Sequence, residues 1–156
     1  MNEPNKRYLE IQLETNVDTE MKLERVAIEQ YTVPLCEWVD GPFLSKALDS
    51  CVAIIVLVDG MSFSAASCAS LLCRLFTNKS FLSNPLPILF AVNKSDNRKA
   101  LHNSVVYSQI EQEVGLIMDC ENYTFKEYSP CTIYACNCSI QADSYSSLLE
   151  FVNASL

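Results

Sequence analysis

The chain has 156 residues, of which 49% are hydrophobic and 19% charged. This composition favours one folded domain, residues 1–156, over a disordered chain. The formal net charge of −8 argues against a nucleic-acid surface and against a polybasic lipid-binding patch, because both need clustered Lys and Arg. No apolar stretch is long enough to span a membrane. Membrane association is therefore expected only indirectly, or through an anchor outside this sequence.

Eight cysteines do not produce a metal-binding pattern. No C-x-x-C pair occurs, and Cys136 and Cys138 are separated by a single residue. Residues 1–14 are polar and lack the apolar core of a secretory signal peptide. We therefore predict free thiols in a reducing, cytoplasmic compartment and no metal site.

The first fifty residues predict a hairpin, a loop and a short helix. Residues 8–14 alternate apolar and polar side chains, which is typical of a strand, and residues 15–19 read as a turn. Residues 21–33 fit helix or strand spacing. A strand that pairs with the first is favoured because the segment ends in Tyr31-Thr32-Val33-Pro34. Residues 35–41 form a predicted loop, and 42–50 a predicted helix that begins at a proline.

The rest of the chain alternates strands and helices. Strands buried on both faces are predicted at 52–58, 88–92 and 132–136, because each is apolar almost throughout. Helices are predicted at 64–76, at 103–114 with Gly115 as the C-terminal stop, and at 142–154 with Asp143 as N-cap. Residues 78–87 and 121–130 are predicted polar connections. This order of strands and helices predicts an α/β fold of three layers, in which helices cover both faces of a mostly parallel sheet. The N-terminal hairpin is expected as an antiparallel edge of that sheet.

One motif stands out at the end of the strand 88–92. The strand leads directly into Asn93-Lys94-Ser95-Asp96. An Asn-Lys-x-Asp loop at this place selects guanine in the small-GTPase superfamily. The phosphate loop G-x-x-x-x-G-K-[ST] of such proteins has no match, because Gly41, Gly60 and Gly115 neither begin nor complete it.

Residues 56–60 and 88–96 together resemble the Arf-like and Sar-like small GTPases, and among them the beta-subunit family of the signal recognition particle receptor. The resemblance covers about residues 32–156. It implies an incomplete P-loop GTPase-like fold, because the first strand, phosphate loop, first helix and first switch have no counterpart. Asp40-Gly41-Pro42 is at best a scrambled relic of the family's Asp-x-Pro-Gly or Asp-x-Gly-Gly switch motif. Asn137-Cys138-Ser139 occupies the place of the Ser-Ala-Lys-type loop.

The same resemblance assigns roles to single residues. Asp96 would accept hydrogen bonds from the ring N–H and exocyclic amine of guanine, a donor pair that adenine lacks. Asn93 would brace the loop, and Lys94 would pack its alkyl stem over the base. Asn137 and Cys138 would offer backbone N–H groups to the base carbonyl. Without a phosphate loop, GTP binding is expected to be weak, with no Mg²⁺ and no catalytic residues.

The resemblance further implies a binding module rather than an enzyme. The expected partner is the alpha subunit of the receptor, at the cytoplasmic face of the endoplasmic reticulum. The segment 34–50 is the expected contact region, with Trp38, Asp40 and Phe43 as candidate contacts. Two alternatives stay open: a fragment or isoform of an active GTPase that binds and hydrolyses GTP, and an Arf- or Rab-like pseudo-GTPase with another partner.

Overall fold

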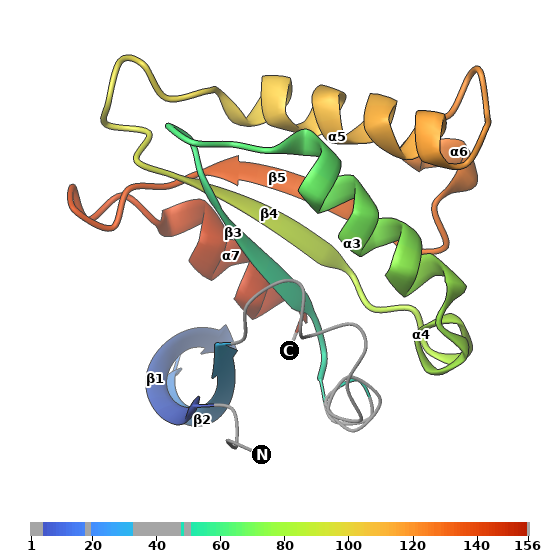
Figure 1. Cartoon of the computed structure of the whole chain (residues 1–156). Coiled ribbons are helices and arrows are strands. Elements are labelled where there is room, and N and C mark those ends of the chain that lie inside the picture. The colour runs from blue at the N-terminus through green and yellow to red at the C-terminus, as the bar shows by residue number, and fades with distance from the viewer. Residues whose placement is uncertain (1–4, 18–19, 33–47, 49–50, 156) are drawn as a thin grey trace. The chain divides into compact units, whose positions relative to one another are not determined.

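The computed structural model describes residues 5–17, 20–32, 48 and 51–155 (Figure 1). The predicted loop at 35–41 and nearly all of the predicted helix at 42–50 lie outside these residues; only Leu48 is described there, helical and buried. The chain divides into two compact units, Met1–Gly41 and Pro42–Leu156. The prediction of a single domain, residues 1–156, stays a prediction.

The first unit contains the predicted hairpin. Strand β1 (Asn5–Val17) pairs antiparallel with β2 (Glu20–Thr32), which decides the ambiguous segment in favour of a strand. The turn predicted at 15–19 is wrong for its first three residues, because ladder pairing continues to Val17↔Glu20 and keeps them extended. The hairpin was expected as an edge of the main sheet. Among the described residues it forms a separate two-stranded sheet.

The second unit is built on three parallel strands in the order β3-β4-β5. They are β3 (Ile54–Asp59), β4 (Ile88–Asn93) and β5 (Ile133–Asn137). All residues of the central strand from Ile88 to Val92 are buried, as its continuous apolar sequence predicts. Parallel register places Asp59 beside Asn93 and Val92 beside Asn137, so the three strands end at one edge of the sheet.

Helices cover both faces of this sheet (Figure 1). Helices α3 (Ala65–Thr77) and α5 (Asn103–Ile117) lie against one face, and α7 (Ser146–Ser155) lies against the other. The apolar stripe of α3 packs inward through Ala69, Leu72 and Leu75, which are all fully buried. The predicted three-layer α/β architecture is confirmed.

Strand β3 departs from the prediction that it is buried on both faces. Ile54, Val56 and Val58 are buried, but the side chains of Ile55 and Leu57 are 43% and 56% exposed. The reason is its position: among the described residues β3 pairs with β4 alone, so it is an edge strand. On that face Leu148 and Phe151 of α7 pack on a cluster made of Leu89, Ala91, Cys136 and Cys138, which belongs to β4, β5 and the residue after β5.

Both predicted polar connections contain a short helix. Helix α4 (Lys79–Ser83) is capped by Asn78, whose side chain accepts from the N–H groups of Ser80 and Phe81. Helix α6 (Phe125–Tyr128) carries a buried Phe125, and the ring of Tyr123 lies 5.8 Å from that of Phe125. These buried aromatic side chains anchor segments whose overall composition is polar.

Two helix boundaries were wrong. Helix α5 continues past Gly115 to Ile117, and the left-handed residue that follows it is Asp119, with φ 52°. Gly115 is instead a contact residue, because an added Cβ would lie 2.9 Å from the Cβ of Tyr123. Helix α7 begins at Ser146, so Asp143 does not cap it; an antiparallel bridge between Ser139 and Ser144 holds the preceding residues in a loop.

The cysteines of the second unit agree with the prediction of thiols. The free thiols are those of Cys68, Cys73, Cys120, Cys131, Cys136 and Cys138. Burial raises the pKa of the Cys68 thiol to about 11. Within the described part of the chain no group of side chains could hold a metal ion, and no helix has the length and apolar character needed to cross a bilayer.

Candidate functional site

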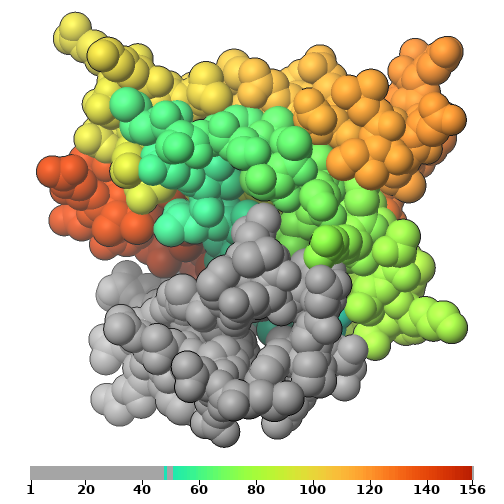
Figure 2. Space-filling model, in the orientation of Figure 1, coloured from blue at the N-terminus to red at the C-terminus, as the bar shows by residue number. Residues whose placement is uncertain are grey.

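The candidate site lies where the strands β3, β4 and β5 end. The loop that follows β4 carries Lys94, Ser95 and Asp96 and leads into α5. Figure 2 shows this yellow segment as a projection at the end of the domain. Ligands of open α/β sheets bind beyond the carboxyl ends of the strands. The loop therefore lies at the edge of the sheet where ligands of this fold class bind.

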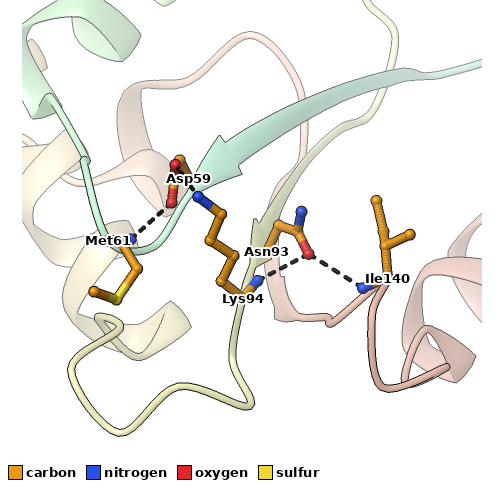
Figure 3. Close-up of polar contacts among 5 residues, drawn as sticks. All are labelled: Asp59, Met61, Asn93, Lys94 and Ile140. Carbon is orange, nitrogen blue, oxygen red and sulfur yellow. Dashed lines mark hydrogen bonds and ion pairs between the residues drawn. The ribbon is translucent and has the colours of Figure 1, made fainter.

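Asn93 holds the loop that follows β4 through its side chain. Its Oδ1 accepts hydrogen bonds from the N–H of Lys94 at 2.8 Å and from the N–H of Ile140 at 3.2 Å (Figure 3). The first bond bends the chain immediately after β4, where Lys94 adopts the left-handed conformation with φ 66°. The second ties the loop to the segment after β5. Asn93 thus fixes two segments that are far apart in the sequence.

The backbone on the other side of Asn93 is held by Gly60. The Gly60 N–H donates to the Asn93 carbonyl at 3.1 Å, and the Leu101 N–H donates to the Gly60 carbonyl at 2.9 Å. A Cβ at position 60 would lie 2.8 Å from the Asn93 carbonyl oxygen. Only glycine allows this close approach without a shift of the backbone.

Asp96 lies on the loop with its side chain exposed, beside Ser139. The Ser139 hydroxyl donates a short hydrogen bond to Oδ1 of Asp96, and its oxygen accepts from the Ala142 N–H at 3.1 Å. Ser139 is almost fully buried. A fixed hydroxyl thus orients the carboxylate and leaves acceptor positions on it for a ligand.

Lys94 does not extend freely into solvent. Its Nζ lies 2.7 Å from Oδ2 of Asp59, the last residue of β3 (Figure 3). The Met61 N–H donates to the other carboxylate oxygen at 2.9 Å. The hydrogen bond from Lys94, followed by the one from Met61, lowers the pKa of Asp59 below its usual range. Asp59 is thus an ionised counter-ion of the loop lysine.

Asn137 and Cys138 were expected to present backbone N–H groups to a base. The Cys138 N–H instead donates to the Val92 carbonyl at 2.8 Å. The Asn137 side chain accepts from the Asn103 N–H at 2.8 Å and so holds the start of α5. The structure therefore brings Asn93, Lys94 and Asp96 together with Ser139 and Ile140. The base-binding role of Asn137 and Cys138 stays a prediction.

Sequence reasoning missed Asp59 and Ser139 as members of the site. The sequence analysis includes Asp59 only among the residues 56–60 that carry the resemblance, and Ser139 only in the segment 137–139 that occupies the place of the Ser-Ala-Lys-type loop. A signal was present in each case, because both residues follow segments that are predicted as strands of the same mostly parallel sheet as 88–92. The expected partner contacts Trp38, Asp40 and Phe43 lie outside the described residues.

A hollow of about 590 Å³ lies elsewhere, against α7. Its lining includes Val52 and Pro87, which precede β3 and β4, together with Tyr134 and Phe151. These residues mark the amino ends of the strands, opposite the loop. The hollow therefore does not contribute to the candidate site.

Comparison with solved structures shows which proteins have a similar fold. A structure of the mammalian SRP receptor matches with a TM-score of 0.74 and 15% identity, over 97% of this chain and 82% of that chain. The chain has the fold of the SRP receptor beta subunit. A receptor SRb-GTP/SRX complex from Chaetomium thermophilum matches with a TM-score of 0.63 and 16% identity, over 99% of this chain and 77% of that chain.

A third structure, receptor SRb-GDP from Chaetomium thermophilum, matches with a TM-score of 0.53 and 19% identity. It covers 66% of this chain and 62% of that chain. No protein-family model and no curated protein sequence matches. At these identities the likeness to the receptor structures establishes a partial P-loop GTPase-like fold and nothing finer. It confirms the fold expected from the resemblance.

Proposed function

We propose that the chain is a binding module of the receptor-beta type, which docks the receptor alpha subunit in protein targeting to the endoplasmic reticulum. The supporting observation is that the match to the SRb-GTP/SRX complex spans 99% of this chain. The likeness to a chain of a complex between a receptor subunit and a protein partner supports a protein-binding role for this chain. The segment 34–50, with Trp38, Asp40 and Phe43, is the proposed contact region.

Nucleotide binding by this module is proposed to be weak and confined to the base. The carboxylate of Asp96, oriented by Ser139, would accept hydrogen bonds from the ring N–H and the exocyclic amine of guanine. Asn93 holds the loop that carries Asp96. The sequence contains no G-x-x-x-x-G-K-[ST] loop to bind the phosphates. Mg²⁺ binding and hydrolysis are not expected, because both depend on bound phosphates.

The test of partner docking is direct binding to the purified SRX domain of the receptor alpha subunit. We expect a saturable 1:1 complex by isothermal titration. Substitution of Trp38 by Ala should weaken it by at least tenfold, as for an aromatic contact residue. The matched control is Tyr145→Ala, since Tyr145 is an exposed aromatic residue before α7. Absence of binding, together with recovery of other partners from cells, would refute the proposal.

A second candidate is a fragment or isoform of an active GTPase. The hydrogen bonds of Asn93 with Ile140 and of Asp96 with Ser139 favour it, because they hold the Asn-Lys-x-Asp loop in one ordered arrangement. The coding sequence upstream of Met1 decides between the two. An in-frame phosphate loop there would make this chain part of a nucleotide-hydrolysing enzyme.

A further inference from the structure

The edge of β3 that faces away from β4 carries backbone groups that no described strand pairs. On the β4 side, the Ile54 N–H donates to the Pro87 carbonyl at 2.9 Å, so the even-numbered residues of β3 point their backbone groups toward β4. Successive residues of a strand alternate in this direction. The N–H and C=O groups of Ile55 and Leu57 therefore point away from β4, and β4 is the one described strand that pairs with β3 (Figure 1).

The side chains of the same two residues form an apolar surface. Those of Ile55 and Leu57 are 43% and 56% exposed, and the parallel register places them beside Leu89 and Ala91 of β4. The strand contains no proline and no charged residue before Asp59. Natural edge strands avoid association through charged side chains, proline or bulges. An edge that lacks charge and proline over most of its length is therefore suited to pair with another apolar strand.

Strand β3 is complementary to a second copy of itself. In an antiparallel pair centred on Val56, Ile55 lies opposite Leu57 of the second copy, and Leu57 lies opposite Ile55 of the second copy. Both residues point their backbone groups outward, so each of these pairs is joined through both of its N–H groups. Side chains of opposite residues share one face, so the isoleucine of each copy packs against the leucine of the other. Asp59 then lies opposite Ala53, and no like charges face each other.

We propose that the chain forms a symmetric homodimer in which the β3 strands of two copies pair antiparallel about Val56 and join their three-stranded sheets. A two-fold interface uses the same surface on both subunits, which the pairing of Ile55 with Leu57 satisfies. The proposal goes beyond the docking of a receptor subunit, because it concerns β3 and not the segment 34–50. The paired strands are short, so the interface is small and the Kd of the dimer is expected at about 10–100 μM.

The experiment is sedimentation velocity of the full chain at concentrations from about 1 to about 500 μM, which span the expected Kd. Wild-type protein should change from monomer to dimer over this range. Leu57→Lys puts a cation on the paired face of each copy and should weaken the dimer by about tenfold or more. The side chain of Leu57 is more than half exposed, so a lysine there extends into solvent in the monomer. Circular dichroism checks that the variant is folded.

Leu116→Lys is the matched control. Leu116 is an exposed leucine of α5, and its substitution changes the net charge by the same amount. This variant should keep the wild-type Kd within about twofold. A second measurement needs no variant. Amide hydrogen exchange of residues 54–59 in wild-type protein should slow at the higher concentration, because the N–H groups of Ile55 and Leu57 become hydrogen-bonded.

Each outcome bears on the homodimer. Dimerisation that is lost in Leu57→Lys and kept in Leu116→Lys, with slower exchange in β3, supports the proposal. A wild-type monomer at every concentration refutes it and shows that a second copy does not pair with β3. A dimer that persists in Leu57→Lys, or exchange of residues 54–59 that does not depend on concentration, places the interface elsewhere and overturns the assignment. Equal weakening by both lysine variants overturns it as well, because charge alone would then control association.

Discussion

Gly60 shows how one residue without a side chain controls the candidate site. Its N–H contacts the Asn93 carbonyl, and its own carbonyl accepts from Leu101, so it joins the end of β3 to both ends of the base loop. The same closeness leaves no room for a Cβ. The base loop thus depends on a residue that makes no side-chain contact with any ligand.

We expect Gly60→Ala to destabilise the protein by about 1–3 kcal/mol, because the new methyl group must displace backbone rather than a flexible side chain. Urea denaturation measures this loss. Ser70→Ala on the exposed side of α3 is the control and should stay within about 0.5 kcal/mol. If the two variants are equally stable, the close approach of residues 60 and 93 is incorrect.

At the scale of the element, the two faces of β3 differ in how far their side chains are exposed to solvent. Ile54 is 7% exposed and faces the side covered by α3 and α5, whereas its neighbour Ile55 is 43% exposed. The two residues are both isoleucine and are neighbours in one strand, so they point to opposite faces. Comparing them therefore compares the burial of the two faces. The alternation arises because α7 packs on β4 and β5 and leaves β3 at the edge of the described sheet.

Ile54→Ala should therefore cost about 2–5 kcal/mol, as expected for a buried isoleucine, and Ile55→Ala about 1 kcal/mol or less. Both are measured by urea denaturation of the full chain, and each serves as the control of the other. Equal losses would contradict the exposure of Ile55.

At the scale of the whole molecule, the net charge limits the class of partner. With 19 acidic and 11 basic residues, the chain has an excess of negative charge, which opposes the phosphate contacts and counterion release that drive binding to nucleic acids. We expect no binding of a fluorescent 20-nucleotide RNA below about 100 μM at physiological salt, measured by anisotropy. Salt-dependent binding at lower concentrations would show a local basic surface that the overall charge conceals.

The sequence alone determined the parallel strands and the place of the base loop. A buried parallel strand is a short apolar run between polar turns, and Ile88–Asn93 carries that signal within a few consecutive residues. The position of Asn93, Lys94 and Asp96 at the sheet edge was likewise predictable, because they form one contiguous motif at the end of that strand. The first strand of the hairpin was predictable from the alternation of apolar and polar side chains in residues 8–14.

Only the tertiary structure decided which side chains complete the site. Ser139 lies 43 positions from Asp96, and Asp59 lies 35 positions from Lys94. Two further features depend on residues outside the element concerned. They are the contact of Gly115 with Tyr123 and the exposure of one face of β3. Local patterns specify the conformation of each segment, but a hydrogen bond or ion pair between segments exists only once packing has brought them together. For this reason the anionic partner of Lys94 could not be foreseen from the motif that contains it.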